Sequence, residues 1–171
     1  MRSNDRYRNL TLRLTRGAVV AALYTVLTYL ATIFGLSSGV IQFRLSEMLC
    51  ILPLLIPEAV PGLFIGCLVS NMLTPGAEIW DVIFGSIATL IGAVGARLLR
   101  RLPEKLIWLS TLPTIIANAL IVPPILILVY GVEEAFMFLV MTVGIGELVC
   151  AGFGGYFLYR VLKPKEKMIF H

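Results

Sequence analysis

Residues 41–73, IQFRLSEMLCILPLLIPEAVPGLFIGCLVSNML, decide how often this chain crosses a membrane. They open on a polar stretch, Ile41-Gln42-Phe43-Arg44-Leu45-Ser46-Glu47, and then turn apolar as far as the break Pro57-Glu58-Ala59-Val60-Pro61. The segment fits two arrangements. It forms either one span from Met48 to Leu73 or two short helices over about 43–56 and 59–73.

The composition around this segment is that of an integral membrane protein. The chain is 58% hydrophobic and only 14% charged, and its charged residues cluster between long apolar runs. This pattern is typical of an all-α protein with several transmembrane helices in one membrane domain. A basic lead-in is predicted at residues 1–16 and a basic tail at residues 163–171. The four further helices are predicted at about 17–34, 80–99, 107–130 and 135–162.

The positive charges decide between the two arrangements. Thirteen of the fourteen Lys and Arg residues lie in three clusters, at residues 2–16, 97–105 and 160–167. Two helices in 41–73 give six spans, with both termini and all three clusters in the cytoplasm, as the positive-inside rule predicts. A single span would place the second and third clusters outside. We therefore predict six transmembrane helices, and we assign the net charge of +4 to topology rather than to nucleic-acid binding.

The second and third of these helices are short. At ~1.5 Å per residue each measures roughly 21–23 Å, less than the ~30 Å hydrocarbon core. Helix ends at membrane depth are tolerated where protein or a cavity covers them. We expect a pocket at the outer ends of these helices, where Arg44, Glu47 and Asn71 lie.

Two polar residues fall near the predicted mid-depth of the membrane. Glu147 lies ~18 Å into the last helix and Asn118 ~17 Å along the fifth, so the two can meet inside the bundle. A carboxyl at this depth is costly unless it is paired or neutralised, which makes Glu147 a candidate for function. The alternative is a protonated glutamate that hydrogen-bonds within the bundle.

Two further features have both a packing and a functional interpretation. Trp80 follows a turn and fits a membrane-interface anchor, or a side chain that stacks on a planar ligand. Ala18 and Ala22 form a small-residue face on the first helix that suits internal packing or docking of a partner subunit.

Several kinds of catalytic chemistry lack their sequence signals. The chain has no Gly-x4-Gly-Lys-Ser/Thr loop for ATP, and its one histidine is the terminal His171. Cys50, Cys67 and Cys150 sit in apolar runs without metal-ligand spacing. We therefore predict neither an enzyme nor a cofactor or metal site in this chain.

The motifs together resemble a known family. Ile41-Gln42-Phe43-Arg44-Leu45-Ser46-Glu47 and Pro61-Gly62-Leu63-Phe64-Ile65-Gly66-Cys67 carry most of the likeness. Other matching positions are Pro53, Pro57, Asn71, Trp80-Asp81-Val82-Ile83-Phe84-Gly85-Ser86 and Gly146-Glu147. The chain resembles the substrate-binding S-components of energy-coupling-factor (ECF) transporters, and among them the QueT-type component for queuosine precursors.

The resemblance implies a fold, a function and partners. The fold is a six-helix bundle in the bacterial cell membrane, with both termini cytoplasmic and an outward pocket capped by the loop between helices one and two. The function is capture of 7-aminomethyl-7-deazaguanine or queuine. ATP-driven uptake would use a transmembrane T-component, contacted by Ala18 and Ala22, and two ATPases.

The candidate ligand can be matched to residue chemistry. A deazaguanine offers adjacent N–H donors, a carbonyl acceptor, a planar face and, in the aminomethyl form, an ammonium. Carboxylates suit the donors and the ammonium, amides donate and accept, and aromatic rings stack. Arg44 can donate to the carbonyl or pair with Glu47 three residues on. The predicted substrate-binding residues are Glu47, Glu147, Arg44, Asn118, Asn71, Trp80 and Phe43, with Tyr130 as a further stacking candidate.

Other functions stay open at this point. A solitary proton-coupled transporter would use Glu147 as its proton carrier, and an S-component for another vitamin would share the fold. A small membrane enzyme or assembly factor ranks last, because such enzymes usually need clustered Asp, His or metal ligands.

Overall fold

In a computed structural model, residues 3–36 and 42–170 are described. Ile41 and most of the loop predicted to cap the pocket lie outside these residues, as do Arg2 and His171. The described residues form helices and connections without a strand, so the predicted all-helical fold is confirmed. In chain order the elements are α1 (Ser3–Ile33), η1 (Leu45–Leu54), α2 (Ala59–Leu73), α3 (Ile79–Leu98), η2 (Leu99–Arg101), η3 (Glu104–Thr111), α4 (Leu112–Leu128), α5 (Phe136–Glu147), η4 (Leu148–Gly154), α6 (Gly155–Leu162), η5 (Lys163–Lys165) and α7 (Glu166–Phe170).

Four long helical segments have the length and apolarity to cross a membrane. They are Tyr7–Ile33, Ile79–Arg101, Glu104–Leu128 and Phe136–Lys165, and two shorter apolar helices, Leu45–Leu54 and Ala59–Leu73, accompany them. These features fit a multi-pass membrane protein. The count of six crossings and the cytoplasmic position of the termini remain predictions.

Residues 41–73 contain two separate helices, η1 and α2. Between them the chain turns at residues 55–58, and Pro57 and Pro61 flank the start of α2. η1 is a 3₁₀-helix, which rises ~2.0 Å per residue instead of ~1.5 Å. Its ten residues therefore extend roughly 20 Å, further than an α-helix of the same length.

Other helices differ in extent from the predicted ranges. The basic lead-in at 1–16 was expected to precede the first helix, but α1 already begins at Ser3 and carries these residues as its first turns. The last long segment is interrupted by the π-helix η4, which follows Glu147 directly. π-Helical turns are rare and occur often at functional sites.

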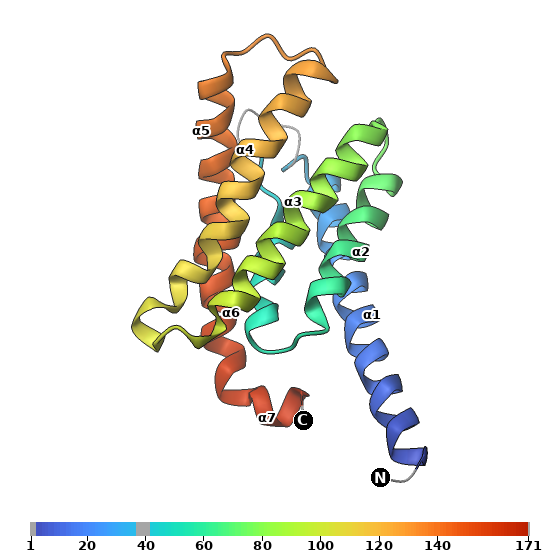
Figure 1. Ribbon diagram of the computed structural model, residues 1–171. Coiled ribbons are helices and arrows are strands. Elements are labelled where there is room, and N and C mark those ends of the chain that lie inside the picture. The colour runs from blue at the N-terminus through green and yellow to red at the C-terminus, as the bar shows by residue number, and fades with distance from the viewer. Residues whose placement is uncertain (1–2, 37–41, 171) are drawn as a thin grey trace.

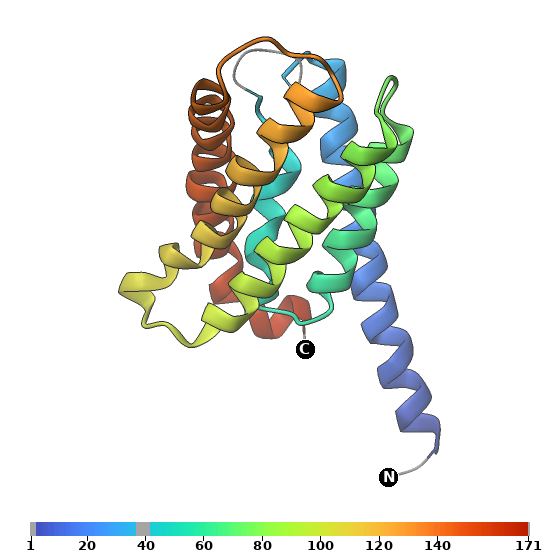
Figure 2. The same ribbon diagram turned by 45° about the horizontal axis from the view of Figure 1, so that its top comes forward.

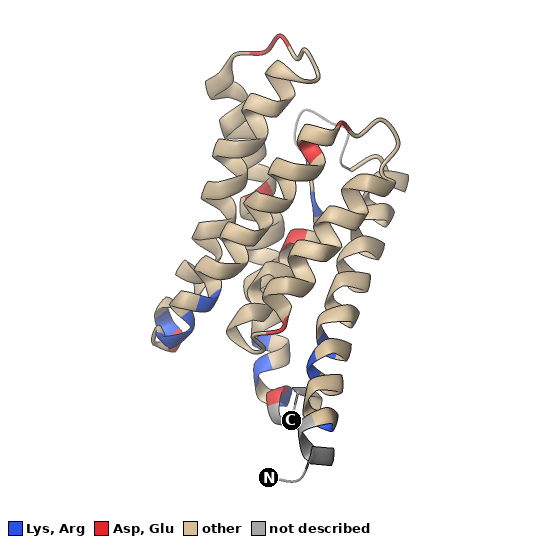
Figure 3. Ribbon diagram, turned by 45° about the vertical axis from the view of Figure 1, so that its right-hand side comes forward, with Lys and Arg blue, Asp and Glu red and all other residues tan. Residues whose placement is uncertain are grey.

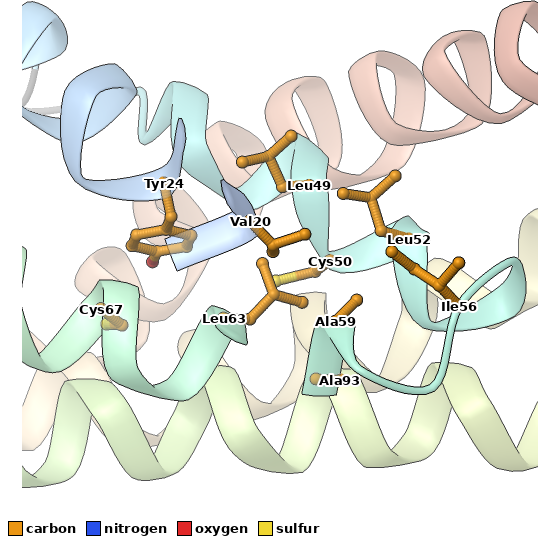
Figure 4. Packing of buried hydrophobic residues seen from close by; sticks show 10 residues of the cluster. All are labelled: Val20, Tyr24, Leu49, Cys50, Leu52, Ile56, Ala59, Leu63, Cys67 and Ala93. Atoms are coloured by element: carbon orange, nitrogen blue, oxygen red, sulfur yellow. The ribbon is translucent and has the colours of Figure 1, made fainter. Parts of the chain in front are cut away.

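The bundle is built around η1. α1 packs on α2, α2 on α3, α3 on α4 and α4 on α5, while η1 contacts α1, α3, α6 and η4. Within η1 all residues but Leu45 and Met48 are buried. Figure 4 shows the apolar core that joins it to α1, α2 and α3, formed by Val20, Tyr24, Leu49, Cys50, Leu52, Ile56, Ala59, Leu63, Cys67 and Ala93.

Glycines on α2 allow its backbone to approach α1 closely. A Cβ at Gly62 would lie 2.6 Å from the Gly17 carbonyl oxygen, and one at Gly66 would lie 2.8 Å from the Ala21 carbonyl oxygen. Real Cβ atoms do not come so near, so the α1–α2 contact depends on these two glycines.

The two ends of the bundle differ in charge. The first and last described residues lie at one end, and the connections after α2 and after α4 lie at the other (Figures 1 and 2). Lys and Arg gather at the end with the chain termini, while several Asp and Glu residues lie towards the opposite end (Figure 3). This distribution follows the predicted orientation, with the termini on the more basic side.

Candidate functional site

A polar cavity opens at the end of the bundle opposite the chain termini. It has a volume of about 450 Å³ and is formed by α1, the segment before η1, the α2–α3 connection and the residues around the end of α4. Most of its lining side chains carry hydrogen-bonding groups. The polar lining residues are Tyr24, Thr28, Thr32, Gln42, Arg44, Ser46, Asn71, Thr74, Asp81 and Tyr130.

Arg44 is the cationic residue of this lining. It stands just before η1 with φ −90° and ψ 86°, outside the helical region. Its carbonyl oxygen accepts the Glu47 N–H at 3.0 Å, and the neighbouring Phe43 N–H donates to the Leu36 carbonyl at 2.9 Å. Among the described residues Arg44 forms no ion pair, so the pairing with Glu47 that the spacing allowed is not made.

Asn71 and Asp81 form the wall next to the α2–α3 connection. The Asn71 side-chain amide donates to the Asp81 carbonyl oxygen at 3.3 Å. This approach requires Gly85, because a Cβ there would lie 2.9 Å from the Asn71 nitrogen. The amide of Asn71 and the carboxylate of Asp81 therefore border the cavity side by side.

Tyr130 connects this wall to the segment after α4. Its hydroxyl oxygen accepts the Glu78 N–H at 3.1 Å and donates to Asp81 Oδ2 at 3.4 Å. Burial raises the pKa of the Tyr130 hydroxyl, so it stays a proton donor at neutral pH. A single side chain thus links two connections at the rim of the cavity.

Glu47 lies behind the cavity wall and is fully buried. Its Oε1 accepts hydrogen bonds from the Tyr24 hydroxyl and, at 3.2 Å, from Thr89 Oγ1, while its Oε2 accepts from Cys50 Sγ at 3.0 Å. Tyr24 itself borders the cavity. Three protein donors therefore satisfy Glu47, and this carboxylate holds Tyr24 in place.

Glu147 and Asn118 are buried without being fully satisfied. Glu147 ends α5 immediately before the π-helix η4, and its Oε2 has no hydrogen-bond partner among the described residues. It lies near enough to Glu47 and Arg44 for their charges to act on it. Asn118 donates to the Thr114 carbonyl at 3.2 Å, while its Oδ1 has no partner in the described chain.

Four other predicted positions lie away from the polar lining. Trp80 is 52% exposed and stacks on Phe84, with ring centroids 6.1 Å apart, beside an apolar groove between α3 and α4. Phe43 is half-buried next to Arg44. Ala18 and Ala22 are both exposed on α1, whose span is the least buried of the four long ones.

The structure therefore brings Arg44 and Asn71 to the cavity, with Glu47 and Glu147 nearby. Sequence reasoning named neither Tyr24 nor Asp81 among the substrate-binding residues. A signal for the first was present: Tyr24, Thr28 and Thr32 recur every four residues on the first helix and form a polar stripe along one face.

Comparisons with known proteins bear on the identity of the chain. A model of the QueT transporter family matches residues 14–164, which include every described residue of the cavity lining. The queuosine precursor transporter QueT of Lactococcus lactis subsp. cremoris (strain MG1363) is 39% identical over 93 residues. This alignment covers 53% of the chain and 53% of the relative, about half the length of each. No solved structure matches the chain.

Proposed function

The chain belongs to the QueT transporter family, and we propose that it is the S-component of an ECF-type importer that captures a queuosine precursor outside the cell. The observation that carries this proposal is the polar cavity, with Arg44 and Asp81 on its lining and no ion pair between them. A cavity of about 450 Å³ falls within the range of small-ligand sites, roughly 300–1,000 Å³.

The polar groups of the cavity complement a deazaguanine. The Arg44 guanidinium can donate to the ring carbonyl, and the Asn71 amide can both donate and accept. Tyr24 and Tyr130 supply aromatic rings at the cavity. Stacking was predicted for Tyr130, and also for Trp80 and Phe43. Asp81 provides a carboxylate for a donor-rich or cationic end of the ligand.

The buried carboxyl groups of Glu47 and Glu147 lie behind the cavity lining and support its residues. Glu47 fixes Tyr24 through its hydrogen bond, and the buried side chain of Glu147 lies near Arg44. The unpartnered oxygens of Glu147 and Asn118 give the bundle interior two further acceptors. In this proposal both glutamates and Asn118 support substrate binding, and neither Glu47 nor Glu147 has to reach solvent.

Uptake requires partners that carry the ATP chemistry. We assign this to a T-component and two ATPase subunits, with ATP bound by those subunits and not by this chain. The exposed Ala18 and Ala22 on α1 provide a smooth surface on which a transmembrane partner can pack closely.

The proposal is tested by binding of radiolabelled 7-aminomethyl-7-deazaguanine to the purified protein. Arg44→Gln should weaken binding about 10- to 100-fold, the value of a lost charge-assisted hydrogen bond. Arg101→Gln removes an exposed positive charge in the basic segment after α3 and should leave binding unchanged. If the wild-type protein bound no deazaguanine, the proposed substrate class would be wrong.

One observation favours a second candidate function. The buried Glu147 with its unpartnered Oε2 also suits the proton carrier of a solitary transporter. That function predicts uptake by proteoliposomes containing this chain alone, abolished when the proton gradient is dissipated. The S-component function predicts binding alone, with uptake only after the T-component and ATPases are added.

A further inference from the structure

We propose that Asp81 is the cation subsite of the cavity and that it selects ligands carrying an ammonium group. This inference rests on the proposed function and adds to it the residue that distinguishes a charged precursor from a neutral one with the same ring.

Asp81 is held in place by its backbone. It lies in the first turn of α3, where its N–H donates to the Glu78 carbonyl at 3.0 Å and its own carbonyl accepts from Asn71 at 3.3 Å. The side chain is half-buried and borders the cavity. The backbone of Asp81 therefore has a fixed position, which directs its carboxylate to the border of the cavity.

The carboxylate of Asp81 has unused acceptor capacity. An ionised carboxylate offers about four acceptor positions. Among the described residues it receives one side-chain hydrogen bond, from Tyr130 at 3.4 Å, which is longer than the usual 2.5–3.0 Å between two oxygens. The Tyr130 hydroxyl already accepts the Glu78 N–H, so its proton is the one directed at Asp81 Oδ2. Oδ1 is left for a ligand.

Gly85 lies beside this oxygen and beside the Asn71 amide. A Cβ at that position would lie 3.7 Å from Asp81 Oδ1 and 2.9 Å from the Asn71 amide nitrogen. The missing side chain thus lets the amide and the carboxylate lie next to each other. A ligand group reaching Oδ1 meets Asn71 as its polar neighbour.

Arg44 and Asp81 are the charged side chains of the cavity lining. They lie near enough for their charges to act on each other. Asp81 has no ion-pair partner in the described part of the chain, and Arg44 remains unpaired with it. Two opposite charges that border one cavity without meeting are suited to a ligand that has an acceptor for one and a cation for the other.

The test compares two ligands on the full-length protein purified in detergent. The cationic ligand is 7-aminomethyl-7-deazaguanine, and the neutral one is the 7-cyano compound with the same ring. Wild-type protein should bind the cation more tightly. Asp81→Asn should weaken binding of the cation about 10- to 100-fold and change binding of the neutral ligand less than about threefold.

Matched variants separate charge from general damage. Glu78→Gln removes an exposed carboxylate three residues away that is not part of the lining, and it should preserve the preference for the cation. Asp81→Glu keeps the charge and should retain part of that preference. An equal loss of affinity for both ligands in Asp81→Asn would contradict the assignment of Asp81 as a cation subsite. Equal affinity of the wild type for both ligands would contradict it as well. Binding of neither ligand by the wild type would overturn the proposed function instead.

Discussion

Replacing Tyr24 by Phe removes one hydroxyl from the buried cluster around Glu47. The hydroxyl donates to Glu47 Oε1, and Tyr24 is only 2% exposed. Phe fills nearly the same volume, so the change leaves the packing intact and removes only the hydroxyl, with its hydrogen bond to Glu47 and its 3.4 Å contact with Thr89 Oγ1. Glu47 keeps its donors Thr89 and Cys50, but it loses the tyrosine hydroxyl.

The expected loss of stability follows from the burial of both partners. Removing one partner of a buried hydrogen bond costs about 1–3 kcal/mol in the free energy of unfolding. For a chain of this size each kcal/mol lowers the melting temperature by about 2–4 °C. Tyr24→Phe should therefore melt roughly 4–8 °C below wild type, taking about 2 kcal/mol.

The protein carries its own reporter for this measurement. Its three cysteines, Cys50, Cys67 and Cys150, are free and buried. A maleimide dye that fluoresces on reaction with thiols will therefore report unfolding as the temperature rises. Tyr29→Phe is the matched control, because Tyr29 is 58% exposed on the same helix, and it should melt within about 1 °C of wild type. Equal melting of Tyr24→Phe and Tyr29→Phe would refute the assigned role of the Glu47 cluster.

Two further substitutions test the contacts of α1 with the same assay. Gly66→Ala should lower the free energy of unfolding by about 1–3 kcal/mol, because its Cβ would lie 2.8 Å from the Ala21 carbonyl oxygen. Gly144→Ala, whose Cβ would have its nearest neighbour at 3.8 Å, is the control, and equal melting of the two would contradict the close approach of α1 and α2. Arg13→Ala breaks the 2.8 Å ion pair with Glu58, but the Arg13 side chain is 64% exposed, so the loss should stay below about 1 kcal/mol. A larger drop would mean that this ion pair fixes the first turns of α1.

Composition and motifs were sufficient for the class of protein and its family. The apolar runs predict an all-helical membrane protein, and the described residues form helices and connections without a strand. The QueT-type resemblance, based chiefly on the motifs at 41–47 and 61–67, is confirmed by the family match over residues 14–164. Such features are local in the chain, so they can be recognised without tertiary structure.

Contacts between distant segments could not be predicted in the same way. The Tyr24–Glu47 hydrogen bond joins residues 23 positions apart, and it exists only because η1 packs against α1. The suggested Arg44–Glu47 pair fails for a local reason: Arg44 precedes the first helical residue, so helical spacing does not apply to it. Trp80 and Asp81 are adjacent, yet successive positions on a helix point about 100° apart, which sends Trp80 to the outer surface and Asp81 to the cavity.

The burial of η1 has a consequence for the order in which the protein assembles. A ten-residue segment is too short to cross the lipid on its own, and the glutamate within it makes independent insertion less favourable still. Among the described residues, its polar side-chain atoms are bonded by groups on α1 and α3 and by its own turns. We therefore expect η1 to enter the membrane only after its neighbouring helices have begun to pack together.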